Sequence, residues 1–235
     1  MSTIPGPLAA EIHIHRLTIP HHPTELAHLQ QLLSPYELNR ASLLKSDRAR
    51  NRFIAGRGSL RTVLSFYLDN APEDIQLECG EHGKPFLADN CKNLRFNLAH
   101  SGELLLVAVT AGVEVGVDIE KAEAGKPFFD MAKLAFSSQE QKKLLEIHES
   151  HLQMDAFYRC WVRKEACMKA CGRGFSLPSN SFDVSMLARE QSQQIVRCNQ
   201  TGWQVLDVTV PQGYYAALAV ESSASSHPYI SFINI

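Results

Sequence analysis

Two stretches of the chain alternate between apolar and polar residues. The first covers residues 11–17, Glu-Ile-His-Ile-His-Arg-Leu, and the second covers residues 113–120, Val-Glu-Val-Gly-Val-Asp-Ile-Glu. A period of two is typical of a strand with one buried face. Shorter apolar runs between turn-forming residues predict further strands at 74–78, 94–98, 104–109, 181–186, 203–210, 214–220 and 229–234.

Helical patterns separate these strands. They predict helices at 24–33, at 34–68 with a break near Ser46-Asp47, and at 128–135, 138–148 and 153–171. The second helix begins with Ser34-Pro35-Tyr36-Glu37, a capping box with proline at the first helical position, and Gly172 is a natural stop for the last. Both halves therefore follow the order strand, helices, strands, which suggests an internal duplication without a residue-level repeat.

Composition narrows the class of protein. The 235 residues are 45% hydrophobic and 20% charged, as in ordinary globular chains, and the net charge of -2 gives no basic field for nucleic acid. The longest apolar runs, such as 104–109, are far too short to span a bilayer, and the N-terminus lacks the pattern of a signal peptide. A cytoplasmic protein is the expectation.

Cysteine and histidine spacings argue against a zinc site. The chain has six cysteines and no Cys-x-x-Cys pair. Cys160, Cys167 and Cys171 share one helix face and are interpreted as buried thiols, not as metal ligands or disulfides. The pair His13 and His15 shares a strand face with no third ligand nearby in sequence, so we expect surface histidines.

Asp118-Ile119-Glu120 places two carboxylates on one side of a strand. Carboxylates side by side repel, and Mg²⁺ relieves that repulsion, especially when substrate phosphates complete its shell. The alternative is a solvated strand end. Glu165 and Lys169 are four residues apart on one helix, so they form either an exposed ion pair or a metal ligand or base next to a phosphate clamp.

Two loop motifs and one basic stretch complete the candidates. His100 lies in a polar turn after a strand, where it could satisfy turn carbonyls, and the adjacent Ser101 has no nucleophile elbow and no evident acid partner that would indicate a serine hydrolase. Gly83-Lys84-Pro85 is not a P-loop. The stretch from Arg40 to Arg61 is strongly basic within a slightly acidic chain, which favours a local anion site over a merely solvated face.

Taken in order, these motifs resemble those of the 4′-phosphopantetheinyl transferases of the surfactin-synthetase-activating (Sfp) type. The resemblance covers about residues 34–220 and rests on the following segments: Phe-Ile-Ala-Gly-Arg (53–57), Gly-Lys-Pro (83–85), Phe-Asn-Leu-Ala-His-Ser (96–101), Gly-Val-Asp-Ile-Glu (116–120), Trp-Val-Arg-Lys-Glu-Ala-Cys-Met-Lys (161–169) and Gly-Arg-Gly-Phe-Ser-Leu-Pro (172–178).

The resemblance implies an α+β fold of two similar α/β half-domains, a pseudo-dimer divided into 1–112 and 113–235, with the coenzyme A site between them. It implies transfer of 4′-phosphopantetheine from coenzyme A to a serine of an apo acyl or peptidyl carrier protein, with release of adenosine 3′,5′-bisphosphate. Mg²⁺, with Mn²⁺ as the alternative, would be the cofactor, and the enzyme would act as a monomer that docks its carrier transiently through apolar and basic residues around 121–150.

The same resemblance assigns roles to single residues. Asp118, Glu120 and Glu165 would ligate the metal, Glu165 and Lys169 would be catalytic, and Arg40, Arg52, Lys84, His100 and Lys169 would bind coenzyme A. Ala99 replaces the serine that the family commonly has before this histidine. Glu140 occupies a position that the family also implicates, but Ser137-Ser138-Gln139-Glu140 is itself a capping box, and we place capping ahead of catalysis.

Two rival functions remain at this point. A Mg²⁺-dependent phosphohydrolase could use the same three carboxylates, and a binding module for coenzyme A or a carrier could have lost its chemistry. The intact Asp118, Glu120, Glu165 and Lys169 argue against such a loss. The sequence leaves the physiological carrier open among fatty acid, polyketide, nonribosomal peptide and aminoadipate pathways.

Overall fold

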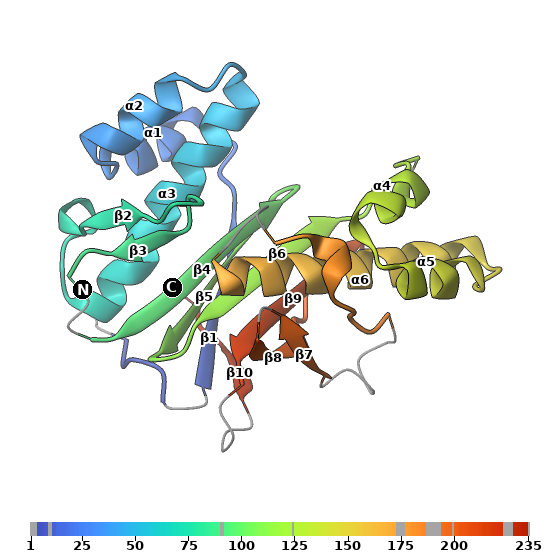
Figure 1. Ribbon diagram of the computed structural model, residues 1–235. Coiled ribbons are helices and arrows are strands. Elements are labelled where there is room, and N and C mark those ends of the chain that lie inside the picture. The colour runs from blue at the N-terminus through green and yellow to red at the C-terminus, as the bar shows by residue number, and fades with distance from the viewer. Residues whose placement is uncertain are drawn as a thin grey trace.

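The structure is a computed structural model that describes residues 4–8, 11–89, 92–123, 125–172, 177–186, 194–198, 200–222 and 228–234. Its helices and strands (Figure 1) occur in the order β1 (Glu11–Thr18), α1 (Pro23–Gln31), α2 (Pro35–Ser42), α3 (Asp47–Leu68), β2 (Leu77–Cys79), β3 (Pro85–Leu87), β4 (Leu94–Ser101), β5 (Leu104–Ala111), β6 (Val115–Lys121), α4 (Phe128–Ala135), α5 (Ser138–Leu145), α6 (Ser150–Cys171), β7 (Gln194–Cys198), β8 (Thr201–Asp207), β9 (Tyr214–Glu221) and β10 (Tyr229–Phe232).

The described elements form an α+β fold built from two half-domains of similar design. One sheet has the strand order β10-β1-β5-β4 and the other has the order β6-β9-β8-β7. In the first sheet β1 pairs antiparallel with β5, and β5 pairs antiparallel with β4. In the second sheet β6 pairs antiparallel with β9, and β9 pairs antiparallel with β8. Each half also contributes one helix of 22 residues, α3 or α6. The α+β fold predicted from the sequence is therefore confirmed.

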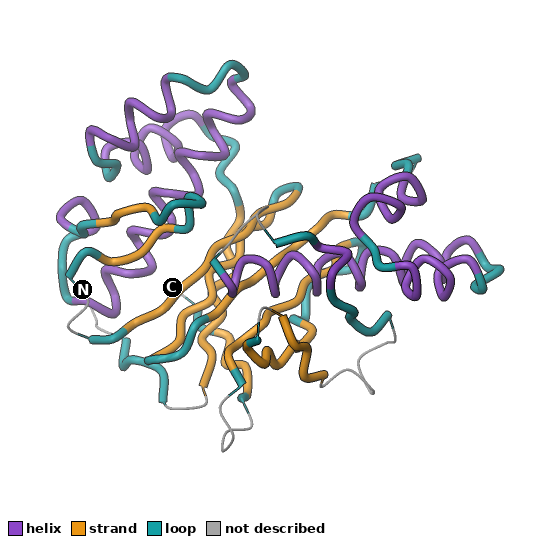
Figure 2. Tube along the Cα trace, in the orientation of Figure 1, coloured by secondary structure: helices purple, strands orange, loops and turns teal. Residues whose placement is uncertain are grey.

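Side chains of β4 join the two sheets. Asn97 Oδ1 accepts a hydrogen bond of 2.9 Å from the backbone N–H of Val117, and Ser101 Oγ accepts one of 2.9 Å from that of Lys121. These side-chain bonds link β4 to β6, whereas neighbouring strands of one sheet are linked by backbone hydrogen bonds. In Figure 2 the strands accordingly lie together at the centre, with helices to either side. At the far edge, β10 pairs in parallel with β1, so the end of the chain returns to the first sheet.

Helix α6 packs unusually close to β6. A methyl group on Gly116 would overlap the carbonyl oxygen of Ala166 and the backbone nitrogen of Ala170, and would lie 2.9 Å from the Cα of Ala170. Glycine is therefore required here by space and not by a positive φ. This contact brings the carboxylates of β6 next to the charged residues of α6.

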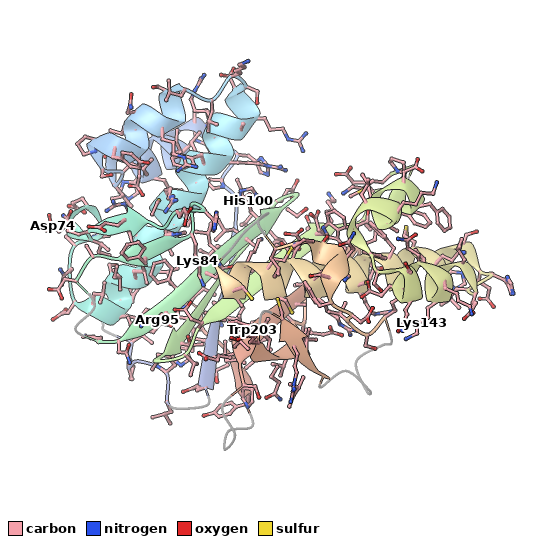
Figure 3. All side chains as sticks on the ribbon, in the orientation of Figure 1. Asp74, Lys84, Arg95, His100, Lys143 and Trp203 are labelled. Carbon is pink, nitrogen blue, oxygen red and sulfur yellow. The ribbon has the colours of Figure 1, made fainter. Side chains whose placement is uncertain are left out.

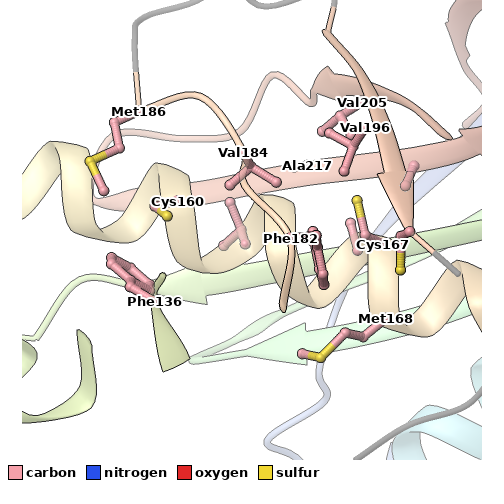
Figure 4. Close-up of a cluster of buried hydrophobic side chains, with 14 of the residues drawn as sticks. Phe136, Cys160, Cys167, Met168, Phe182, Val184, Met186, Val196, Val205 and Ala217 are labelled. Atoms are coloured by element: carbon pink, nitrogen blue, oxygen red, sulfur yellow. The ribbon is translucent and has the colours of Figure 1, made fainter. Parts of the chain in front are cut away.

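The core of the second half lies around α6. Cys160 and Cys167 are buried there, as predicted, beside side chains from the segment that follows the helix (Figure 4). Cys171 is half-buried, with its Sγ 3.3 Å from Cys198 Sγ. Cys91 lies outside the described residues.

The strand predicted at 181–186 is wrong. A 3₁₀ turn covers Ser179–Ser181, and the rest of the segment has no strand partner among the described elements. Its backbone is held by buried side chains instead. Lys164 Nζ donates to the carbonyls of Ser179 and Phe182, and Glu140 Oε1 accepts from the N–H of Val184 at 2.7 Å. The apolar pattern reflects burial against α6, which periodicity alone cannot distinguish from a strand.

The short strands were the least predictable. The strand expected at 74–78 is a 3₁₀ turn at Pro72–Asp74 followed by β2, and the sequence pattern missed β3 and β7. The strand β2 and its partner β3 have three residues each, too few to show a period. The break expected near Ser46-Asp47 is confirmed, because Ser46 caps α3 by accepting from the N–H of Ala49.

The interpretation of His13 and His15 as surface residues is also wrong. Both are buried, and both bind the hydroxyl of Tyr67 on α3: His13 Nδ1 lies 2.8 Å and His15 Nε2 lies 2.6 Å from the Tyr67 oxygen. His13 Nε2 lies 3.3 Å from Glu11. Burial, followed by the charge of His13, lowers the pKa of His15 to about 4, so its ring is neutral in the folded protein.

We expect His15 to make the fold sensitive to acid. Between pH 6.5 and pH 4 the unfolded chain binds a proton at this residue that the folded chain does not, so stability falls as the pH falls. His15→Leu should reduce this loss by on the order of 2 kcal/mol. Urea unfolding at pH 7 and pH 5 measures it, with the exposed His28→Gln as control. An acid sensitivity unchanged by His15→Leu would contradict the assignment.

Candidate active site

One cavity, of about 320 Å³, lies between the two halves. It collects residues from α2, α3, the β2–β3 hairpin, β4 and the C-terminal end of α6. Figure 3 shows Lys84 and His100 on this side of the molecule, whereas Lys143 lies far away on α5. The lining residues are Arg40, Arg52, Phe53, Gly56, Arg57, His82, Gly83, Lys84, Pro85, Asn97, Leu98, His100, Met168, Lys169 and Gly172. All five residues predicted to bind coenzyme A therefore line the same cavity.

The arginines of the basic stretch have different surroundings. Arg40 and Arg57 lie over the ring of Phe53, at 5.9 and 5.6 Å from its centroid. Arg52 donates to the carbonyl of Gly102 at 3.3 Å. Arg61, however, is buried and paired with Glu37 at 2.8 Å, so it holds α2 against α3 and is not part of the anion site. The basic stretch therefore contributes three arginines that line the cavity and one, Arg61, that forms a structural ion pair.

Lys84 spans the two halves. Its Nζ donates to Glu114 Oε2 at 2.8 Å, to the carbonyl of Val115 at 3.1 Å and to the carbonyl of Ala170 at 3.3 Å. An ammonium group has three N–H donors, so all three have acceptors here. Lys84 thus ties the β2–β3 hairpin to β6 and α6, and a phosphate would have to compete with Glu114 for this ammonium group.

His100 lies at the end of β4, with its side chain open to solvent on one side. Desolvation by the pocket wall, then the positive charge of Arg52, lowers the pKa of His100. A neutral ring offers one donor and one acceptor, and a phosphate would favour its protonated form. The neighbouring Ala99 is buried in the core, 4% exposed, so its methyl group packs inward and does not reach the cavity.

The carboxylates and Lys169 form a charged cluster on one flank of the cavity. Asp118 is 5% exposed, and Lys169 Nζ lies 2.7 Å from its Oδ1. Burial raises the pKa of Asp118 to about 7, Lys169 opposes the rise, and Glu165 and Glu120 add to it. Burial raises the pKa of Glu165 as well, opposed by Lys169 and reinforced by Glu120. Asp118 and Glu120 share one strand, and the gap between β6 and α6 is bridged by the bond from Lys169 to Asp118.

The cluster has the properties of a cation site. Asp118 Oδ2 is buried and has no hydrogen-bond partner in the part of the chain that the structure describes. Hard carboxylate oxygens of this kind suit Mg²⁺ or Mn²⁺. Over those same ranges, however, no three histidine, cysteine or acidic side chains form a ready-made metal cluster. The donor set fits a divalent cation, with the unpartnered Asp118 Oδ2 on the side of the carboxylate that Lys169 does not engage.

Both carboxylate oxygens of Glu140 have partners within the fold. Its Oε2 accepts from the N–H of Ser137 and pairs with Lys164, both at 2.8 Å, and its Oε1 accepts from the N–H of Val184. The side chain is 1% exposed, and the capping box with Ser137 is present. These contacts agree with the prediction that Glu140 caps a helix.

Sequence reasoning missed several lining residues. Phe53, Asn97 and Met168 lie inside the quoted motifs but were not singled out as pocket residues. Their positions follow from spacing, since each is within three residues of a predicted site residue. Arg57 belongs to the basic stretch and to the motif at 53–57, but it was not assigned to the pocket either. The segment 173–176 of the last quoted motif lies outside the described residues.

Known proteins match this arrangement in both halves. A family model described as "4′-phosphopantetheinyl transferase superfamily" matches residues 114–219, and one described as "4′-phosphopantetheinyl transferase, N-terminal" matches residues 20–112. The 4′-phosphopantetheinyl transferase HetI of Nostoc sp. is 31% identical over 217 residues, which are 91% of this chain and 89% of HetI.

Two further relatives differ in origin. A 4′-phosphopantetheinyl transferase of Bacillus subtilis is 35% identical over 136 residues, 58% of each chain. The L-aminoadipate-semialdehyde dehydrogenase-phosphopantetheinyl transferase of Rattus norvegicus is 27% identical over 219 residues, 85% of this chain and 71% of the rat protein.

The fold and the site thus place a cavity lined by basic residues beside an acidic cluster. The chain belongs to the 4′-phosphopantetheinyl transferase family, whose members transfer phosphopantetheine from coenzyme A to carrier proteins. In the described ranges, no helix has both the length and the apolar character needed to cross a membrane.

Proposed function

We propose that this enzyme is of the Sfp type and modifies a serine of an apo acyl or peptidyl carrier protein in a Mg²⁺-dependent reaction that releases adenosine 3′,5′-bisphosphate. One observation carries the proposal: the five basic residues assigned to coenzyme A line one cavity, and Lys169 belongs both to that cavity and to the acidic cluster. A molecule with phosphates at both places would bridge the two halves. The division into half-domains 1–112 and 113–235, action as a monomer, and a cytoplasmic location are parts of the same proposal.

Each side chain has a role that its surroundings support. Arg40, Arg52 and His100, grouped on the N-terminal side of the cavity, would bind the 3′-phosphate of coenzyme A. Lys84 would contribute positive charge at the hairpin. Asp118, Glu120 and Glu165 would hold the metal ion, which supplies charge neutralisation at the pyrophosphate.

The chemical step is a substitution at phosphorus. The carrier serine oxygen forms a bond to the β-phosphorus of coenzyme A, and the bond from that phosphorus to the bridging oxygen breaks. Glu165 takes the serine proton, for which a carboxylate of raised pKa is suited. Lys169 stabilises the negative charge that develops on the departing phosphate.

The test combines the protein, coenzyme A, Mg²⁺ and a panel of apo-carriers, followed by mass spectrometry of each carrier. We expect a mass gain of one phosphopantetheine arm and formation of adenosine 3′,5′-bisphosphate, both lost when EDTA is added. No mass gain on any carrier would contradict the transfer to these substrates. Phosphate release without a carrier would instead favour the phosphohydrolase.

For the carrier we propose a docking face on α4 and α5. Leu134 is 81% exposed and Leu145 is 64% exposed, and the exposed Lys133, Lys142 and Lys143 surround them. Exposed leucines among lysines fit a partner with an apolar contact inside an acidic surface, as expected of a carrier near its serine. Such an interface is salt-sensitive and forms quickly.

Leu134→Glu should raise the KM for the carrier about tenfold and leave the KM for coenzyme A within twofold. Steady-state kinetics with either substrate varied measures both values, and high salt should raise the wild-type KM for the carrier. Leu8→Glu, at a leucine 69% exposed in the first half, is the matched control. Equal carrier KM values for the two variants would place the docking face elsewhere.

A further inference from the structure

The β4–β5 turn touches both the cavity and the acidic cluster. It consists of Gly102 and Glu103, and Ser101 is the last residue of β4 before it. The carbonyl of Gly102 accepts from Arg52, which lines the cavity, and the N–H of Glu103 donates to the Tyr214 hydroxyl at 3.3 Å. Gly102 has a φ of 57°, and a methyl group there would lie 2.5 Å from Tyr214 Oη. The turn is therefore seated tightly against the ends of β6 and β9.

Just before this turn, the two hydrogen-bond partners of Ser101 set the direction of its hydroxyl group. Its oxygen accepts from the backbone N–H of Lys121 at 2.9 Å, and it lies 3.0 Å from Glu120 Oε2. A backbone N–H can only donate, so the single hydroxyl hydrogen of Ser101 points at Glu120. The bond crosses from the first half-domain to the second and engages one carboxylate oxygen of Glu120.

The other end of the seam is held in the same way. Asn97, four residues earlier on β4, accepts from the N–H of Val117, four residues before Lys121. Asp118 and Glu120 lie between these two attachment points. Within the described ranges, the bond from Ser101 is the one hydrogen bond that the structure gives for the side chain of Glu120.

We propose that Ser101 is a positioning residue that orients Glu120 for the divalent cation, an inference that rests on the proposed metal-dependent function. Hydrogen-bond partners of metal-binding carboxylates set their orientation, and their removal commonly weakens metal binding 10- to 100-fold. Ser101 itself would touch neither metal nor coenzyme A. Its hydroxyl would couple the turn that carries the Arg52 contact to the cluster that carries the metal.

The experiment titrates Mn²⁺ into the protein saturated with coenzyme A, without a carrier, and follows free Mn²⁺ by electron paramagnetic resonance. Ser101→Ala should weaken Mn²⁺ binding about tenfold. Ser101→Thr keeps the hydroxyl and should stay within threefold of wild type. Ser101→Cys keeps the size but donates weakly, and should be weakened like alanine, which provides a second variant if Ser101→Ala does not fold. Ser65→Ala, which removes a hydroxyl bonded only to the Thr62 carbonyl, is the control.

The outcomes separate this inference from the proposed function. Loss of Mn²⁺ affinity in Ser101→Ala or Ser101→Cys, with rescue by threonine, supports the role. Wild-type affinity in both variants, or equal loss in threonine, overturns it while the metal site stands. Failure of the wild-type protein to bind Mn²⁺ overturns the metal site and the inference together.

Discussion

Gly116→Ala is expected to destabilise the protein by about 3 kcal/mol or more and to lower the rate of transfer at least 10²-fold. The new methyl group would overlap backbone atoms of Ala166 and Ala170, which cannot rotate away as a side-chain end can. Helix α6 must therefore move away from β6. Overpacking a core usually costs roughly 1–3 kcal/mol, and a backbone contact belongs at the upper end.

The loss of activity has a separate cause. Moving α6 separates Glu165 and Lys169 from Asp118, and a displacement of about 1 Å can cost about 10² in rate. Urea unfolding and the carrier mass assay measure the two effects. Gly202→Ala is the matched control, because its methyl group would make ordinary contacts of 3.5 and 3.6 Å in β8. Wild-type stability of Gly116→Ala would contradict the requirement for glycine at the contact between α6 and β6.

Glu165→Gln is expected to reduce kcat about 10³-fold while making the metal-free protein more stable. The loss of rate follows because the amide cannot take the serine proton, a role worth roughly 10²–10⁴ in rate. The gain in stability follows from the raised pKa of Glu165, since burial penalises its charged form and glutamine has no charge.

The sign of the pH dependence provides a sharper check. A carboxyl group whose folded pKa is raised stabilises the fold only when protonated, and this contribution is lost as the pH rises through the folded pKa. Thermal unfolding in EDTA should therefore show a larger advantage for Glu165→Gln at pH 8 than at pH 4. Glu25→Gln, on the exposed side of α1, should change neither kcat nor this difference. A variant that keeps wild-type kcat would exclude Glu165 as both base and metal ligand.

The long elements were predictable because their signals are local. Capping boxes at Ser34 and Ser137, the stop at Gly172 and the strands predicted from the alternating segments 11–17 and 113–120 all appear in the structure. The segment before Met186 was misread because its backbone bonds go to Lys164, Glu140 and Arg163, which are distant in sequence. No period can reveal such a partner.

The candidate site shows the same division between local and long-range information. Motif positions were enough to select Arg40, Arg52, Lys84, His100 and Lys169, which the cavity brings together. They could not show that Glu114 holds the ammonium group of Lys84, or that Ser101 bonds Glu120 across the seam. Those facts depend on how two sheets approach, and they require coordinates.

The parallel pairing of β10 with β1 has a consequence for how the two halves relate. Because β10 pairs with β1, the chain leaves the first sheet, forms the second sheet and then returns to the first. The halves resemble two separate units in design, yet the first sheet takes its edge strand β10 from the end of the chain that follows the second sheet. The second sheet, β6-β9-β8-β7, is built from residues 115–221 alone. Separating the two halves exposes the edge of β1, an open template for aggregation. The two halves are thus connected at two places, by the side-chain bonds between β4 and β6 and by the pairing of β10 with β1. Two connections favour small adjustments of the cavity over wide opening.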